Sequence, residues 1–226
     1  MHRTFIVAAL LGVFAATVLT ADEPQPAPSK LETVAQRGGY AIGYDIGMRF
    51  EDSIDLDAMV RGFRDAIAEK ESALSDEQRM QAVRTLQTQV MQAAARRNAE
   101  EGAEYRDANA KRDGVKVTDS GLQYEVIEEG DGPSPDASDT VTVHYRGTLI
   151  DGTEFDSSYE RGEPATFPLN RVIGGWTEGL QLMNVGAKYR FVIPPELGYG
   201  QRGNPPIGPN ATLVFEVELL GIESGE

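Results

Sequence analysis

The chain has 226 residues, of which 40% are hydrophobic, and a formal net charge of -15 at pH 7. Such acidity argues against nucleic acid as a partner, because a negative surface repels the phosphate backbone. The chain has no cysteine and two histidines, which excludes disulfides and thiolate chemistry and argues against a histidine-rich metal site or a Ser-His-Asp triad.

The N-terminus has the pattern of a signal peptide. Two basic residues precede an apolar run from Phe5 to Leu19, and small residues follow up to Ala21. The run is shorter than the roughly 20 residues of a transmembrane helix; an uncleaved membrane anchor is the alternative. We expect a signal peptide over residues 1–21 with cleavage near Ala21, a flexible Pro-rich linker over residues 22–30, and export of the mature protein.

The segment 31–113 has a helical pattern, and its last part predicts one long helix. Ser75 and Gln78 form a capping box, in which each side chain can bond the other residue's backbone. Apolar residues then recur at spacings of three and four, at Met80, Val83, Leu86, Val90 and Ala94. We expect a helix from Asp76 to Asn109, about 50 Å long. One small domain cannot bury such a helix, so we expect a solvent-exposed spacer or half of an assembly.

Three glycines precede this helix at a spacing of four. Gly39, Gly43 and Gly47 would share one face of a helix. Each glycine costs a helix about 1 kcal/mol relative to alanine, so three on one face favour the close approach of a second helix. A helix loosened by its glycines is the alternative. A further short helix is predicted from Leu56 to Ala68.

From Gly114 onward the pattern changes to period two, which is typical of half-buried antiparallel strands. Apolar and polar residues alternate in four segments, 122–126, 140–146, 187–193 and 212–219. Asp151-Gly152 predicts a β-hairpin turn, and one short helix is expected from Gly174 to Met183. One helix against four or more strands makes residues 114–226 an α+β domain.

Four longer motifs lie within this domain. They are VHYRGTLIDGTEFDSS (143–158), VIGGWTEGLQLMNVG (172–186), IPPELGYG (193–200) and NATLVFEVELL (210–220). Together they resemble FKBP-type peptidyl-prolyl cis/trans isomerases over about residues 115–223. The preceding part, from YAIGYDIG through the long helix to GVKVTDSGLQYEVIEEG, resembles the macrophage infectivity potentiator-like subgroup. Members of that subgroup dimerise through an N-terminal helical domain and carry their catalytic domains on long helices.

The resemblance implies a curved antiparallel sheet wrapped around one short helix, with the substrate pocket between them. The implied pocket residues are Tyr145, Phe155, Asp156, Val172, Ile173, Trp176, Tyr199, Ile207 and Phe215. Trp176 would be the floor, and Arg161 would hold Asp156 from behind. On the pattern alone, Tyr145, Phe155, Trp176 and Phe215 are better explained as core residues, because inward-facing aromatic residues usually belong to the core. His144 points away from the Tyr145 face by alternation, and we interpret it as structural.

The resemblance also implies a role for each pocket residue. Asp156, Tyr199 and Trp176 would be catalytic, and the other six pocket residues would bind substrate. The Ile173 N–H and the Tyr199 hydroxyl would bond carbonyls beside the proline, while Asp156 would act electrostatically near the rotating carbonyl. Rotation about an X-Pro bond breaks no covalent bond, so we expect neither a cofactor nor a metal.

The sequence departs from the common small family members at the rim of the implied pocket. The stretch between Phe155 and Trp176 is slightly shorter, and Ala165 stands where a phenylalanine is frequent. The loop 201–209 is also shorter and carries Pro205-Pro206, and Asn204 stands where many members have a histidine. These differences leave the central aromatic residues unchanged.

Several partners follow from the resemblance: proline-containing polypeptides as substrates, macrolide inhibitors of the FKBP class, and a second copy of the chain bound through residues 31–113. The expected location is the periplasm or the outer surface of a Gram-negative bacterium. Three functions stay open: an isomerase for exported proteins with chaperone activity as a dimer, a binding module or chaperone on the same fold, and a structural dimer unit. Acceleration of X-Pro exchange would distinguish the first from the others.

Overall fold

The computed structural model describes residues 30–50 and 53–223. The predicted signal peptide, and all of the predicted linker except Lys30, lie outside these residues. The chain divides between Arg49 and Phe50 into two compact units, which are described separately here. The boundary that the sequence suggests between residues 113 and 114 stays a prediction.

The described part of the first unit, residues 30–49, contains one helix, α1 (Val34–Phe50), whose last residue falls beyond the unit boundary. It begins with a capping box that the sequence analysis missed: the Gln36 N–H donates to Thr33 Oγ1 over 3.1 Å, and the Thr33 N–H donates to Gln36 Oε1 over 3.0 Å. The three glycines at a spacing of four all lie in this helix. A Cβ built on any of them would meet nothing within 4 Å among the described residues, so none of these residues covers their face.

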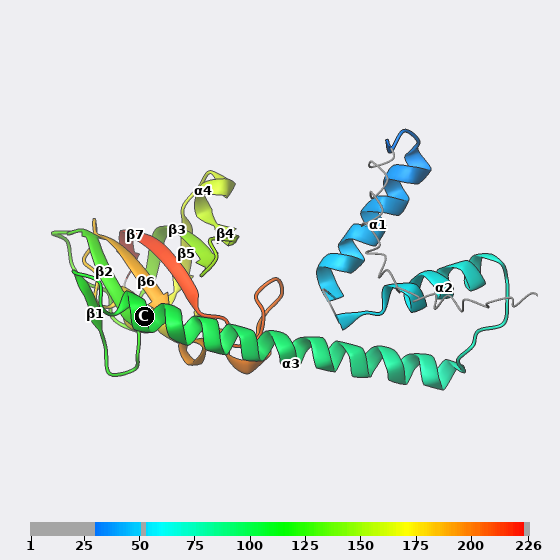
Figure 1. Ribbon diagram of the computed structural model, residues 1–226. Helices are drawn as coiled ribbons and strands as arrows, with labels where there is room; N and C mark the ends of the chain where they lie inside the picture. The colour runs from blue at the N-terminus through cyan, green and yellow to red at the C-terminus, as the bar shows by residue number, and fades with distance from the viewer. Residues whose placement is uncertain (1–29, 51–52, 224–226) are drawn as a thin grey trace, which may run out of the picture. The chain divides into compact units, whose positions relative to one another are not determined.

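Two helices open the second unit, and both match the expected ranges. Helix α2 (Leu56–Ile67) starts at Asp55, whose side chain accepts from the Ala58 N–H over 2.8 Å. Helix α3 (Asp76–Asn109) has the predicted bounds, and both bonds of its predicted capping box are present. Its only buried residues among those described are Gly102 and Asn109, so most of this long helix faces solvent (Figure 1).

Seven strands of the described chain form one antiparallel sheet, in the order β1-β2-β6-β7-β3-β4, with β5 also paired to β3. The strands are β1 (Val115–Val117), β2 (Gln123–Glu128), β3 (Thr140–Leu149), β4 (Glu154–Ser157), β5 (Ala165–Pro168), β6 (Lys188–Ile193) and β7 (Leu213–Glu223). One side of β3 pairs with β7, while the other pairs with β5 along its first half and with β4 along its second. Tyr145 therefore lies where the pairing partner of β3 changes.

The expected short helix is α5 (Gly174–Leu180), followed by turns up to Met183. It packs tightly on the sheet because two of its four buried residues are glycines. A Cβ on Gly175 would lie 2.5 Å from Ile193, and one on Gly179 would lie 2.7 Å from Phe191. Both partners belong to β6 and are fully buried. The core of the domain thus lies between α5 and the concave side of the sheet.

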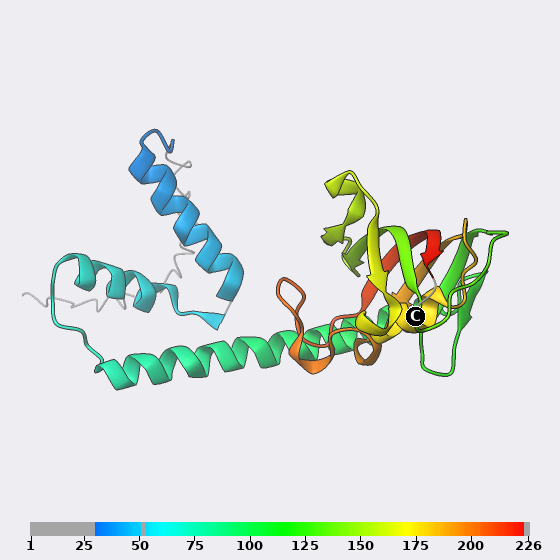
Figure 2. The same ribbon diagram turned by 180° about the vertical axis from the view of Figure 1, so that it is seen from behind.

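The expectation of one short helix missed a second one, the single turn α4 (Ser158–Arg161) between β4 and β5 at the sheet edge (Figure 2). The Ser157 hydroxyl accepts from the Glu160 N–H at its start, and Gly162 ends it at a φ of 75°. A serine cap and a terminal glycine are helix signals, but four residues are too few for a periodic apolar pattern. This turn carries Arg161 to the site.

Candidate active site

The indole of Trp176 forms the floor of a cavity, and three aromatic rings surround it edge to face. The ring centroids of Tyr145, Phe215 and Phe167 lie 5.0, 5.3 and 5.5 Å from that of Trp176, at interplanar angles of 86°, 78° and 87°. The edge-to-face arrangement directs the positive edge of one ring at the negative face of the next. The rings come from α5, β3, β5 and β7, so the sheet and its helix build the floor together.

The cavity above this floor has a volume of about 580 Å³, within the range of small-ligand pockets. It is lined by Tyr145, Phe155, Asp156, Phe167, Arg171, Val172, Ile173, Trp176, Tyr199, Asn204, Pro205, Pro206, Ile207 and Phe215. The structure therefore brings together all nine residues that the sequence analysis placed in the pocket. Their individual roles in binding and catalysis stay predictions.

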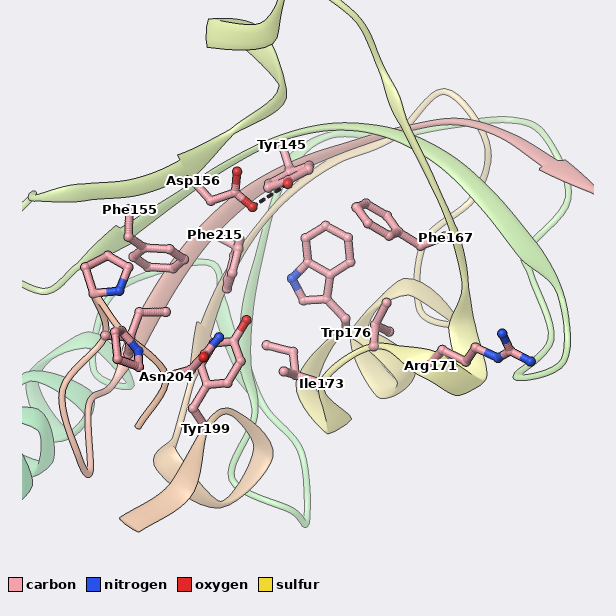
Figure 3. A pocket seen from close by; sticks show the side chains of 14 residues that line it. Tyr145, Phe155, Asp156, Phe167, Arg171, Ile173, Trp176, Tyr199, Asn204 and Phe215 are labelled. Carbon is pink, nitrogen blue, oxygen red and sulfur yellow. Dashed lines mark hydrogen bonds between the residues drawn. The ribbon is translucent and has the colours of Figure 1, made fainter. Parts of the chain in front are cut away.

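A polar network lies at one side of this aromatic cavity, and Figure 3 shows its bond between Tyr145 and Asp156. The Tyr145 hydroxyl donates to Asp156 Oδ2 over 2.5 Å and accepts from Arg161 Nη2 over 2.7 Å. Arg161 Nη1 also donates to Asp156 Oδ1 over 2.5 Å. The carboxylate is thus fixed through both oxygens. Arg161 occupies the position behind Asp156 that the sequence analysis expected.

Burial and this network raise the pKa of the Tyr145 phenol. Loss of solvent around Tyr145, together with its bond to the Asp156 carboxylate, raises the pKa of the phenol to about 12. Bonds to the tyrosine oxygen and to the carboxylate raise the pKa of Arg161 above its usual value. Tyr145 is therefore a neutral donor, and Arg161 is a permanent cation, throughout the physiological pH range.

Three further groups at the cavity carry unused hydrogen-bonding capacity. Trp176 Nε1 is buried and has no acceptor among the described residues, and Figure 3 shows it on the side of the indole that faces Phe215. The Ile173 N–H likewise donates to no described residue, while its carbonyl accepts from the Trp176 N–H over 2.9 Å at the start of α5. The half-buried Tyr199 contributes its phenol to the cavity lining.

The sequence analysis left five lining residues out of its site. Phe167 follows Ala165 by two positions on β5, so both side chains are on the same face, and its ring packs on Trp176 where Ala165 is too short to reach. The alternation of β5 could have identified it. Arg171 extends away from the indole in Figure 3, whereas Asn204, Pro205 and Pro206 lie on the shortened loop.

His144 lies outside the residues that line the cavity. Its ring stacks on Tyr159 with centroids 4.7 Å apart, and its Nδ1 lies 3.0 Å from the Ser158 hydroxyl. The structural interpretation of this histidine therefore agrees with the contacts it makes.

The described residues contain no cluster of acidic and histidine side chains that could hold a metal ion. None of the helices in residues 30–50 and 53–223 is long and apolar enough to cross a bilayer.

Comparison with known proteins identifies both halves of the chain. Residues 132–220 match the family model of FKBP-type peptidyl-prolyl cis-trans isomerases, and residues 35–126 match the model of the domain amino-terminal to such isomerases. The isomerase FkpA of Escherichia coli is 46% identical over 205 residues, which are 83% of this chain and 76% of the relative. The outer membrane protein MIP of Legionella longbeachae is 37% identical over 237 residues, covering 99% of each.

A solved structure supports the same assignment. The crystal structure of FkpA from Escherichia coli is 44% identical and covers 87% of this chain and 100% of that one, with a TM-score of 0.64. The agreement extends over the helical part, the sheet and the short helix, which bears out the expected α+β architecture. The chain belongs to the FKBP-type peptidyl-prolyl cis-trans isomerases and carries the domain that is amino-terminal to such isomerases.

Proposed function

We propose that this cavity binds the proline of an X-Pro segment in exported polypeptides and lowers the barrier to rotation of its peptide bond. That barrier is about 18–20 kcal/mol because rotation breaks the amide resonance. The twisted amide has a less polar carbonyl than the planar amide, so a dry aromatic cavity penalises the planar ground state more. The observation that carries the proposal is the buried Trp176 floor enclosed by rings, with one fixed carboxylate at its edge.

Each lining group has a proposed role in this process. The proline ring rests on Trp176 between Tyr145, Phe155 and Phe215. Val172 and Ile207 close the apolar sides of the cavity.

The polar groups act on the carbonyls of the bound segment. The unused Ile173 N–H and the Tyr199 hydroxyl donate to carbonyls that flank the proline. Asp156 stabilises the altered charge of the rotating amide, and Arg161 holds that carboxylate in place. No group transfers a proton, so the chemistry requires neither a cofactor nor a metal.

Exchange of a short X-Pro peptide tests the proposal. We expect the full-length chain to accelerate cis/trans exchange, and Asp156→Ala and Tyr199→Phe each to lower kcat/KM by about tenfold or more. A macrolide of the FKBP class should compete with the peptide and change the fluorescence of Trp176, the only tryptophan in the chain. Wild-type protein that leaves the exchange rate at its value in buffer would refute the enzyme assignment of this cavity.

We also propose that residues 31–113 form a homodimer. Leu56, Phe63 and Ile67 recur at helical spacing on α2 and are 64%, 48% and 81% exposed in the single chain. Such an uncovered apolar stripe is costly in water and marks an interaction surface. The uncovered glycine face of α1 offers a second surface, where two backbones can approach closely.

Sedimentation of the full chain tests the dimer. Gly43→Leu places a large side chain on the glycine face, so we expect it to shift the protein toward monomer. Gly38→Leu is the matched control, because Gly38 lies in the same helix, with equally open space around it, on a different face. A wild-type monomer at micromolar concentration would remove the dimer proposal. If both variants dissociate the dimer equally, the cause is the changed helix propensity and not the glycine face of α1.

A chaperone activity of the dimer is the second candidate function. It is supported by the length of α3, whose Met80, Val83 and Met91 are 57%, 51% and 51% exposed, and by the apolar surface of α2. We place the protein in the periplasm or at the outer surface of a Gram-negative bacterium, because its N-terminus resembles a signal peptide and a full-length relative is named an outer membrane protein. Suppression of client aggregation by Asp156→Ala protein would separate this activity from isomerisation.

A further inference from the structure

One side of the cavity is a loop that makes no hydrogen bond to the strands of the sheet among the described residues. The rim loop, residues 203–209, contributes Asn204, Pro205, Pro206 and Ile207 to the cavity lining. Its own backbone closes it into a tight turn, since the Asn204 N–H donates to the Ile207 carbonyl over 2.9 Å and the Ile207 N–H donates to the Asn204 carbonyl over 2.7 Å. These bonds define the shape of the loop, and the buried Ile207 packs it against the core.

The far end of the rim loop is attached to the long helix α3. Asn98 Nδ2 donates to the Pro209 carbonyl over 2.8 Å, and Asn210 Nδ2 donates to the Ala95 carbonyl over 3.2 Å. The two amides therefore connect helix and loop in both directions. The contact is close, because a Cβ on Gly208 would lie 2.9 Å from Asn98 Nδ2.

The next two turns of α3 are fixed to the sheet itself. A Cβ on Gly102 would lie 2.5 Å from the hydroxyl of the buried Thr212, and the Arg106 guanidinium donates to the same hydroxyl. Gln123 of β2 donates to the Arg106 carbonyl over 2.9 Å and accepts from Asn109 over 2.8 Å. These contacts hold residues 102–109 of α3 against the sheet beside β7. The two asparagine bonds therefore connect the rim loop to a helix that is itself attached to the sheet.

We propose that α3 is a functional part of the isomerase site, and that Asn98 and Asn210 are positioning residues that set the rim loop over the cavity. Neither side chain lines the cavity; both act through the loop that carries Ile207 and the two prolines. Their loss should weaken the binding of the substrate residues next to proline while leaving the rotation step at Trp176 and Asp156 unchanged. The inference rests on the proposed use of this cavity for X-Pro peptides.

Steady-state isomerase kinetics on the full-length chain test the inference. Asn98→Ala removes the amide, and Asn98→Asp keeps its size while turning a charged acceptor toward the Pro209 carbonyl. Asn210→Gly removes the other amide without straining the backbone, because Asn210 has a φ of 54°. Gln89→Ala is the control, an exposed residue on the same helix with no hydrogen bond to the sheet among the described residues.

We expect all three asparagine variants to raise KM about three- to tenfold, as for the loss of one hydrogen bond, with kcat within about twofold of wild type. The affinity for the macrolide, followed by Trp176 fluorescence, should fall in parallel, and Gln89→Ala should match wild type. An unchanged KM in Asn98→Ala and Asn210→Gly would overturn the inference while the proposed function stands, and so would an equal rise in Gln89→Ala. Wild-type protein without activity would instead refute the proposed function.

Discussion

The hydroxyl of Tyr145 is the central connection of the polar network, and Tyr145→Phe removes it while keeping the ring. In the wild type this oxygen joins Asp156 Oδ2 over 2.5 Å to Arg161 Nη2 over 2.7 Å. The variant leaves the ion pair between Asp156 Oδ1 and Arg161 in place. It therefore removes the restraint on one carboxylate oxygen without removing the charge.

The structure sets the size of the expected effect. A hydrogen bond to a charged group contributes about 1.5–3 kcal/mol when it is well shielded. The side chains of Asp156 and Arg161 are each 44% exposed, so water replaces part of the lost bonding, and we expect the free energy of unfolding to fall by about 1–2 kcal/mol. Because a mobile carboxylate is poorly placed for the rotating amide, kcat/KM should fall about tenfold, or about 1.4 kcal/mol.

The assay combines urea unfolding with peptide exchange, and Tyr159→Phe is the matched control. The Tyr159 hydroxyl bonds only weakly to Glu218, over 3.4 Å, and its side chain lies outside the cavity. We expect that control to change stability by less than about 0.5 kcal/mol and to leave the activity unchanged. A double-mutant cycle with Asp156→Ala completes the test. Unchanged kcat/KM in Tyr145→Phe, or additive losses in the cycle, would contradict a role exerted through Asp156.

Three further predictions concern pH, packing and the floor of the site. The pKa of Tyr145 is raised to about 12 in the folded state, so the free energy of unfolding should fall as the pH rises from about 10 to about 12, and urea titrations of Tyr145→Phe should lack this component. Gly62→Ala on exposed α2 should stabilise the protein by about 1 kcal/mol, whereas Gly102→Ala should give no gain, because its Cβ would lie 2.5 Å from Thr212 Oγ1; a gain in thermal denaturation equal to that of Gly62→Ala would contradict the packing. Phe167→Ala should weaken X-Pro peptide binding about two- to tenfold through lost packing on Trp176, and an unchanged KM would place that ring outside the binding surface.

The local elements of this protein could be predicted because their signals are local. The bounds of α3 follow from a capping box at Ser75 and a long apolar period. Helix α5 and the strands β2, β3, β6 and β7 follow from similar patterns within a few residues, whereas the short strands β1, β4 and β5 were not predicted. Helix α4 escaped prediction because a single turn has no period to detect, although Ser157 and Gly162 mark its ends.

The site was predictable in a different way. Alternation alone could not distinguish Tyr145, Phe155 and Phe215 from ordinary core residues, and only the resemblance to a known family singled them out. Phe167 was missed because the comparison focused on Ala165, whereas the structure supplies an aromatic ring from two residues further along the same strand.

The sequence by itself determined the long polar helix and the absence of any thiol, and its resemblance to a known family singled out the aromatic residues and the carboxylate of the cavity. Only the tertiary structure decided which groups act together. Asn98 and Pro209 are separated by 111 positions in the sequence, and Arg106 and Thr212 by 106. No periodic pattern predicts a contact between residues so far apart in the sequence. The periodic pattern of apolar residues predicts which side chains are buried. Hydrogen bonds between polar groups that are distant in the sequence form only once the sheet has brought β7 and the rim loop beside α3.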